Sequence, residues 1–333
     1  MVFCSKCVLP ETFPGINFEE KGICNYCLHT PIPDEGKKKD YLNEFEDLLN
    51  SKKGKNDYDA IVAYSGGKDS TYTLHFLISK YGLNVLAWTF DNGFLSDQAK
   101  INIINMTDKI GATSMIVRPP FDIMKKAFRF AAINDIYSAK TLDRASSICT
   151  TCIGLVKALV LKTALHMNIP LVAYGWSPGQ APISSAIMQT SPRLQRMTHK
   201  TIKEPFLKQV GPELSTYFVT DAELDIDKER WPKNIHPLAF VDYNEEEILK
   251  VIQSLGWKKP SDTDPNSTNC LLNALANYLH KKRFGFHPYA WEIAGIVRGG
   301  NMHREEGIIK TNQEEDMNMV KYAADKLNIE ISD

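Results

Sequence analysis

A short run of glycine, serine and charged residues offers the clearest chemistry in the sequence. Ser65-Gly66-Gly67-Lys68-Asp69-Ser70 follows an apolar run and precedes a stretch with helical periodicity. Two adjacent glycines let the backbone approach an anion closely, and a helix N-terminus offers free N–H groups and a positive dipole end. The Lys68 ammonium adds positive charge, and Asp69 could orient the loop or hold Mg²⁺. The run predicts a phosphate-binding corner, although a plain Gly-Gly turn before a helix is the alternative.

Seven cysteines form a second chemical pattern. Cys4 and Cys7 make one Cys-x-x-Cys pair, and Cys24 and Cys27 make another after sixteen intervening residues. Four thiolates in so short a span predict a structural zinc site, because they fill all tetrahedral positions. Redox-active disulfides are the alternative interpretation.

The three remaining cysteines lie farther along the chain. Cys149 and Cys152 form a third pair, and Cys270 stands alone. Three cysteines can hold a 4Fe-4S cluster that keeps one iron open. Buried free thiols or a redox switch would explain the same residues. We expect all three to lie near helix N-termini, which lower the pKa of a thiol.

Strands and helices that alternate along the chain must position these residues. Apolar runs of strand length and stretches of 3.6-residue periodicity give the expected elements. The predicted strands are 59–64, 84–90, 114–117 and 170–175, and the predicted helices are 39–51, 69–81, 97–110, 121–133, 152–167, 245–255, 270–283, 288–297 and 313–327. This alternation indicates an α/β fold with a doubly wound parallel sheet. We expect three parts: a zinc-ribbon-like segment (1–30), an α/β domain with a loop-rich insertion at 176–240 (31–240), and a helical C-terminal region (241–333).

The glycine-rich corner resembles the SGGxDS signature of the PP-loop ATP pyrophosphatases, which have an adenine nucleotide alpha hydrolase-like fold. In that family ATP is cleaved between its α- and β-phosphates, which leaves an adenylated substrate and free pyrophosphate. The resemblance implies that residues 31–240 bind ATP and Mg²⁺, with catalytic roles for Lys68 and Asp69. The implied nucleotide-binding residues are Tyr64, Ser65, Gly66, Gly67, Lys68, Asp69, Ser70, Asp91 and Gly175. The last two follow predicted strands, where ligands bind in such sheets, although Trp176 replaces a histidine common after Gly175.

The inner cysteines resemble those of the iron-sulfur-dependent tRNA thiouridine synthetases of the same superfamily. Those enzymes carry the same loop, a central Cys-x-x-Cys followed by glycine and a basic residue, and a later single cysteine. The counterparts here are Cys149, Cys152, Gly154, Lys157 and Cys270, with Lys157 one residue farther along than usual. The resemblance implies a 4Fe-4S cluster on the three thiols and catalytic roles for these cysteines and Lys157.

The first quarter of the chain is similar to another group, the N-acetyl sugar amidotransferases. The similarity lies in Cys-x-x-Cys-Val-x-Pro-x-Thr-x-Pro-Gly-Ile, in Gly-x-Cys-Asn-Tyr-Cys, and in Asp-Tyr-Asp-Ala-Ile-Val-Ala-Tyr before the loop. Those enzymes draw ammonia from a separate glutaminase subunit. This second resemblance implies the same adenylation, with ammonia in place of sulfide and without a cluster.

The sequence therefore predicts an enzyme that adenylates a substrate oxygen with ATP. In the first version, sulfide then converts C=O into C=S. In the second version, ammonia forms an amide on an N-acetyl sugar. The third interpretation is that the chain is a non-catalytic zinc- and nucleotide-binding module.

The composition and charge of the chain limit the kinds of partner that such a protein can have. The net charge of −1 gives no global basis for nucleic-acid binding, and the basic stretch from Arg193 to Lys208 is also typical of a solvated face. The acceptor is a small molecule or tRNA, and the nucleophile comes from a sulfide donor system or a glutaminase subunit. Without a membrane-length apolar run or a signal peptide, we expect a cytoplasmic location and no membrane partner. The oligomeric state is left open, a homodimer included.

Overall fold

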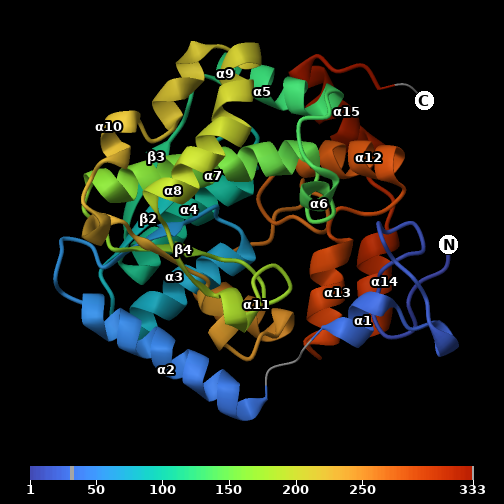
Figure 1. The fold of residues 1–333 in the computed structure, drawn as a ribbon, viewed down its shortest axis with the longest axis horizontal. Helices are drawn as coiled ribbons and strands as arrows, with labels where there is room; N and C mark the ends of the chain where they lie inside the picture. The colour runs from blue at the N-terminus through green and yellow to red at the C-terminus, as the bar shows by residue number, and fades with distance from the viewer. Residues whose placement is uncertain (31–33, 332–333) are drawn as a thin grey trace.

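A six-stranded sheet runs through the centre of the protein, which a computed structural model describes for residues 1–30 and 34–331 (Figure 1). Its strands are β1 (Ala60–Ala63), β2 (Val85–Phe90), β3 (Thr113–Val117), β4 (Leu171–Tyr174), β5 (Ile187–Gln189) and β6 (Lys233–Ile235). They lie in the order β3-β2-β1-β4-β6-β5, and β5 pairs antiparallel to β6 while the other pairs are parallel. The predicted doubly wound parallel sheet is confirmed.

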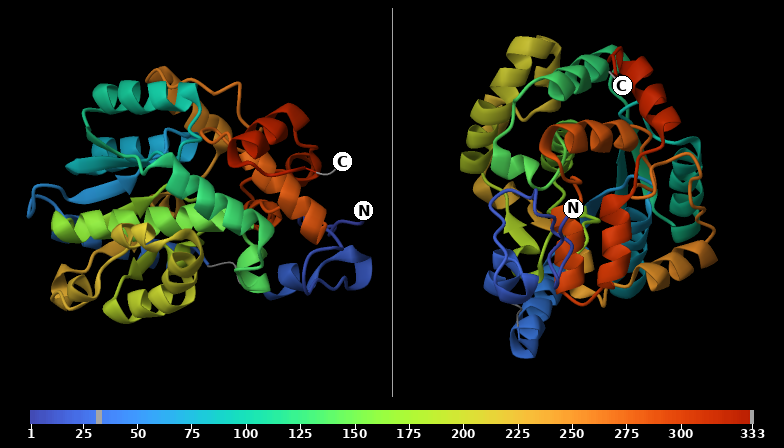
Figure 2. Two further views of the ribbon diagram at one scale, coloured as in Figure 1. Left: turned by 90° about the horizontal axis from the view of Figure 1, so that it is seen from above. Right: turned by 90° about the vertical axis from the view of Figure 1, so that its right-hand side faces the viewer.

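Helices cover both faces of this sheet (Figure 2). The longer ones are α2 (Glu35–Lys52), α3 (Lys68–Tyr81), α4 (Asp97–Ile110), α5 (Phe121–Ile133), α7 (Ser147–His166), α11 (Glu245–Ser254), α12 (Asn273–Phe284), α13 (Ala290–Arg298), α14 (Arg304–Asn312) and α15 (Met317–Leu327). The shorter ones are α1 (Asn25–His29), α6 (Ala139–Leu142), α8 (Pro192–Thr198), α9 (Glu204–Val210) and α10 (Asp221–Leu224). Short 3-10 segments are η1 (Glu20–Gly22), η2 (Ile183–Ser185), η4 (Pro212–Tyr217), η5 (Lys228–Arg230) and η6 (Pro237–Phe240), and η3 (His199–Lys203) is a short π-helix.

The central strands contribute side chains to two hydrophobic cores, one on each face of the sheet, because successive side chains of a strand point to opposite faces. Ala60 and Val62 of β1 pack with residues of α2, α3 and α4. Ile61 between them packs with residues of α5, α7 and α12. All six residues of β2 are buried, which is why this strand reads as a continuous apolar run rather than an alternating one.

The apolar helix α7 carries two of the inner cysteines near its start. It begins at Ser147, five residues before the predicted boundary, because the Ser146 hydroxyl accepts the Cys149 amide hydrogen and caps the helix. Contrary to our expectation from the sequence, α7 is long and apolar enough to cross a membrane by length and composition alone. Half of its most apolar window is buried inside the protein, and the helix packs against α5, α12 and β4.

The region 176–240, which we expected to be irregular, contains two strands and several short helices. β6 extends the parallel part of the sheet beside β4, and β5 forms its edge. Strands of three residues are too short to show a period in the sequence, which explains the error. The basic stretch lies on α8, η3 and α9, where Arg193, Lys200 and Lys208 are exposed and His199 is buried.

The N-terminal segment packs against α13 and α14, which come from the C-terminal part of the chain (Figure 1). Arg304 at the start of α14 donates from Nε to the carbonyl oxygens of Cys4 and Cys7, at 2.9 and 3.1 Å. α14 was not predicted, because Gly307 interrupts its pattern. A Cβ at Gly307 would lie 2.8 Å from Val8 Cγ1, so the glycine permits this close approach.

The expected helical character of the C-terminal region is confirmed, because the described chain after residue 241 forms helices α11 to α15. Its helices α12 and α15 share a core with α5 and α7, and α11 packs against α3. The division into three domains stays a prediction. Its first boundary adjoins residues 31–33, which lie outside the described residues, as do residues 332–333.

Candidate functional site

The glycine-rich corner lies between the end of β1 and the start of α3. Gly66 adopts a left-handed backbone with φ of 75°, and a Cβ there would lie 2.6 Å from the Ala99 carbonyl oxygen. Trp257 Nε1 donates to the Gly66 carbonyl oxygen at 2.9 Å. The positive φ and the close approach to Ala99 require glycine at this position, and the Trp257 hydrogen bond helps to hold the loop in one conformation.

Hydroxyl groups order the rest of the corner. Ser65 Oγ and Ser70 Oγ lie 3.1 Å apart, and Ser70 Oγ donates to the Gly67 carbonyl oxygen at 3.1 Å. Thr268, far along the chain, accepts the Lys68 amide hydrogen through Oγ1 at 3.0 Å. This amide is one of the free donors at the N-terminus of α3, so Thr268 occupies a position that suits a phosphate oxygen.

The Lys68 ammonium group belongs to a compact polar group. Its Nζ lies 2.8 Å from Asp69 Oδ2 and 3.2 Å from the Tyr243 hydroxyl, which donates to Asp69 Oδ1 at 3.1 Å. Glu245 lies 3.9 Å from the same Nζ. Burial alone would lower the pKa of Lys68, but the neighbouring Asp69, Tyr243 and Glu245 raise it well above its ordinary value. Lys68 therefore stays cationic.

A cavity of about 370 Å³ opens over the corner. It lies where the strand order reverses between β1 and β4, which is where ligands bind in doubly wound sheets. Gly175 follows β4, and a Cβ there would lie 2.7 Å from the Ser70 backbone nitrogen. Lys259 and Lys310 also line the cavity, and their charges suit a polyphosphate.

Two of the predicted nucleotide-binding residues face elsewhere. Asp91 accepts the Gly93 amide hydrogen at 2.9 Å and lies 3.5 Å from Arg118 Nε. It is absent from the residues that line the cavity, because this turn directs its carboxylate toward Arg118. Tyr64 lies behind the loop, with its hydroxyl 3.4 Å from the Asn102 carbonyl oxygen.

The three inner cysteines line one cavity of about 260 Å³, called here the cysteine cavity. Asn92 Nδ2 lies 3.4 Å from Cys152 Sγ, and Asn273 Nδ2 lies 3.9 Å from Cys149 Sγ. Burial raises the pKa of Cys149 and of Cys152 to about 12. Cys270 lies three residues before α12, in a β-bridge with Leu95, so the expected helix N-terminus is not its environment. Cys152 also lines the cavity over the loop, so the two cavities share a wall.

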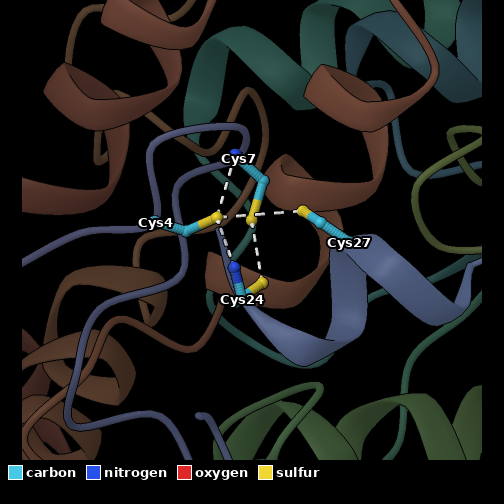
Figure 3. A group of neighbouring side chains, drawn as sticks. All are labelled: Cys4, Cys7, Cys24 and Cys27. Carbon is cyan, nitrogen blue, oxygen red and sulfur yellow. Dashed lines mark hydrogen bonds between the residues drawn. The ribbon is translucent and has the colours of Figure 1, made fainter. Parts of the chain in front are cut away.

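The four outer cysteines converge on one point (Figure 3). Their sulfur atoms lie within 4.8 Å of one another and are buried. Backbone N–H groups of Lys6, Cys7 and Cys24 point at Cys4 Sγ, at 3.4, 3.4 and 3.2 Å. Burial alone would raise the pKa of Cys4, but these amides lower it to about 7. The group could hold a metal ion.

The chain matches no model of a known protein family. It is 27% identical over 310 residues to an uncharacterized protein of Methanocaldococcus jannaschii, across 91% of this chain and 90% of that protein. Two solved structures are similar to it, each with a TM-score of 0.37. One is the U34-tRNA thiolase NcsA from Methanococcus maripaludis with its 4Fe-4S cluster (16% identity, 90% of this chain and 86% of that one). The other is NMN synthetase from Francisella tularensis (12% identity, 89% and 98%). At this TM-score, neither likeness supports a conclusion about the reaction.

The place of the glycine-rich loop in the sheet is more informative. It follows the first strand and opens the first helix of the doubly wound sheet, at the reversal of strand order. The chain resembles the PP-loop ATP pyrophosphatases. The sequence pattern and the chain's own topology both carry this resemblance.

Lys157 lines the cavity of about 370 Å³ over the glycine-rich loop, called here the PP-loop cavity, beside a tryptophan. Its Nζ lies 4.3 Å from the centre of the Trp176 ring, and His236 stacks on the same ring at 4.7 Å. Burial of the ammonium group lowers the pKa of Lys157 to about 8, but solvent reaches much of the side chain and weakens this effect. Lys157 and Trp176 thus form one wall of the PP-loop cavity.

The PP-loop cavity also contains residues that sequence reasoning missed. Glu292 of α13 accepts the Ser177 hydroxyl hydrogen at 2.7 Å, and burial, aided by the Asp69 charge, raises the pKa of Glu292 to about 7. Tyr243 and Glu245 contact the PP-loop itself. None of them belongs to a short motif, so the sequence held no local signal for them.

Proposed function

We propose that the chain uses ATP to adenylate an oxygen of its acceptor and then replaces this oxygen with sulfur. The observation that carries the proposal is the shared wall formed by Cys152 between the PP-loop cavity and the cysteine cavity. A nucleophile held at the cysteines would reach an activated carbon without leaving the protein. Such positioning makes the attack effectively unimolecular.

In the first step, the acceptor oxygen attacks the α-phosphorus of ATP and the bond to the β-phosphate breaks. The amides at the N-terminus of α3 and the Lys68 ammonium stabilise the leaving pyrophosphate. Asp69 lies where it could hold Mg²⁺, with its two oxygens now occupied by Lys68 and Tyr243. The arriving phosphates would take over the Lys68 ammonium and free this carboxylate for the metal.

The inner cysteines fit a cluster better than a single ion. The three residues line one cavity of about 260 Å³, whereas the group that could hold a single metal ion, within residues 1–30 and 34–331, is formed by the outer four cysteines. The amide groups of Asn92 and Asn273 point at two of the sulfurs, and such contacts tune iron-sulfur clusters. When bound, a 4Fe-4S cluster with an open iron would supply a place for sulfide.

The outer cysteines fit a structural zinc ion, because four buried thiolates leave no open position. This zinc would stabilise the N-terminal segment against α13 and α14 rather than take part in the reaction. We further propose a cytoplasmic location, where all seven thiols stay reduced.

Amide transfer is the second candidate. The N-terminal sequence pattern favours it, and it needs the same adenylation at the PP-loop. It differs in the nucleophile, which would be ammonia from a glutaminase, and it assigns no metal to the inner cysteines.

Anaerobic purification separates these candidates. Thiolation predicts a brown protein with about four irons per chain, and AMP and pyrophosphate release that depends on acceptor and sulfide. A Cys152→Ala variant should lose the iron, whereas the control Gly154→Ala, with nothing within 4 Å of the new Cβ, should keep it. A colourless protein whose AMP release depends on ammonia would refute thiolation and support amide transfer. A protein that binds ATP but releases no pyrophosphate with any acceptor would refute both.

A further inference from the structure

A third cavity, of about 800 Å³, lies between the N-terminal segment, α2 and α13, and is called here the Trp291 cavity. Gln180 lines this cavity, the PP-loop cavity and the cysteine cavity. Arg144 lines both the Trp291 cavity and the cysteine cavity. The Trp291 cavity therefore adjoins the place where the PP-loop and the inner cysteines meet. Its volume is typical of small-molecule sites.

Two arginines flank a rigid aromatic platform in this cavity. The guanidinium carbons of Arg144 and Arg298 lie 5.5 and 5.2 Å from the centre of the Trp291 ring. The ring is held by the N-terminal segment, where Phe13 stacks on it at 5.8 Å and Tyr26 meets it edge-on at 5.1 Å. The folded cysteine segment thereby fixes the ring beside which both cationic groups lie.

In the described part of the chain these arginines form no ion pair, although burial raises the pKa of the nearby Asp143 carboxyl and the charge of Arg144 acts to lower it. Arg298 Nε and Nη1 are buried without any hydrogen-bond acceptor. Within residues 1–30 and 34–331, no ion pair joins a carboxylate to Arg144 or Arg298. Two carboxylates also line the cavity, Asp242 and Glu35, of which Glu35 is 2.6 Å from Lys38. Guanidinium nitrogens taken out of water without an acceptor carry an unrecovered desolvation cost, which a bound anion would offset.

We infer that the Trp291 cavity binds an oxyanion group, a phosphate ester or a carboxylate, of a small acceptor molecule. Guanidinium groups recognise both anions with paired N–H donors. An acceptor anchored there would extend past Gln180, with its reactive oxygen toward the PP-loop and its carbon toward Cys152. The role of this site in the reaction rests on the proposed function, whereas the binding of an anion in the Trp291 cavity does not.

The structure favours a small molecule over RNA as the occupant. The cavity is lined by α2, by the loop around Gln180, by α13 and by Thr30, and its volume of about 800 Å³ suits a small molecule. Its charged groups lie on its walls, whereas an RNA backbone requires a long exposed basic surface. The exposed basic residues on α8 and α9 are not among the residues that line it.

Direct titration calorimetry without ATP tests the inference. The probes are ribose 5-phosphate and glucuronate, and neutral ribose is the uncharged control. At least one anionic probe should bind the wild type, more weakly as salt is raised, and ribose should not bind. Arg298→Gln should weaken that binding about tenfold or more, and Arg144→Gln should weaken it too. The matched control Arg193→Gln, on exposed α8, should bind like the wild type.

ATP binding measured on the same variants separates the two proposals. If Arg298→Gln binds ATP normally and loses the anionic probe, the fold is intact and the inference holds. Wild-type protein that binds neither probe, or Arg298→Gln and Arg144→Gln variants that both bind as the wild type does, would overturn it. Loss of tRNA binding in Arg298→Gln with unchanged probe binding would also overturn it. Probe binding through Arg298 in a protein that never binds ATP would refute the proposed function alone.

Discussion

The substitution Glu292→Gln tests the electrostatics of the PP-loop cavity most directly. The Glu292 carboxyl is half-buried at the cavity wall and accepts the Ser177 hydroxyl hydrogen at 2.7 Å. Burial raises the pKa of Glu292 from its ordinary value of 4.5 to about 7. Glutamine has nearly the same shape and can still accept from Ser177, but it has no charge to bury.

The sign of the effect follows from proton binding. The folded protein keeps the Glu292 proton to a higher pH than the unfolded chain does, so the free energy of unfolding falls as pH rises from 4.5 to about 7. This rise in pKa corresponds to a loss of at most about 3 kcal/mol above the folded-state pKa. Because glutamine does not titrate, Glu292→Gln should be more stable than the wild type at pH 8, by up to that amount. Near pH 5 most of this gain should vanish.

Urea unfolding followed by circular dichroism at pH 5 and pH 8 measures this difference. Glu314→Gln, in the exposed segment between α14 and α15, is the matched control and should change little between the two pH values. If Glu292→Gln differs from the wild type by the same free energy at both pH values, the carboxyl is not desolvated. The proposed role of burial in this cavity would then be wrong.

Three further predictions concern the PP-loop and the outer cysteines. Gly175→Ala places a methyl group 2.7 Å from the Ser70 backbone nitrogen; it should cost about 1–3 kcal/mol by overpacking and abolish ATP binding in calorimetry, whereas Gly154→Ala should do neither. Thr268→Val removes the hydroxyl that accepts from the Lys68 amide; since a phosphate oxygen competes for that N–H, ATP should bind about fivefold tighter, and weaker binding would contradict this competition. Treatment with a strong chelator should release a metal ion from the outer cysteines and lower the midpoint of thermal unfolding by several degrees in calorimetry; an unchanged midpoint would contradict a structural role for that metal.

The parts of the fold predicted from the sequence are those with local signals. The helices at 97–110 and 121–133 have the predicted bounds in α4 and α5. Ser96 caps the first of these through the Ala99 amide, and prolines precede the second, so each start has a local cause. The PP-loop was recognisable for the same reason, because its glycines, hydroxyls and following helix are consecutive in the chain.

The parts that were missed depend on contacts between distant residues. Tyr243 reaches Lys68 and Asp69 from about 175 positions away in the chain, and the sequence around it resembles no motif. Asp91 shows the opposite error, since its place after a strand was correct but its carboxylate is taken by Gly93 and Arg118. Position at the edge of a sheet is readable from a sequence, whereas the direction of a side chain is decided by its neighbours.

A single segment joins the two halves of the candidate site. Thr268 accepts the Lys68 amide hydrogen, and the Asn269 carbonyl oxygen accepts the Ser96 amide hydrogen at 2.9 Å. Cys270 follows directly, in its bridge with Leu95. Because neighbouring residues of one segment cannot move independently, a substitution that shifts the backbone here disturbs the PP-loop and the cysteine cavity together. Loss of activity in a Cys270 variant would therefore not assign this thiol a role. Only separate measurements of iron content and of ATP binding on the same protein can distinguish an effect on the cluster site from an effect on the nucleotide site.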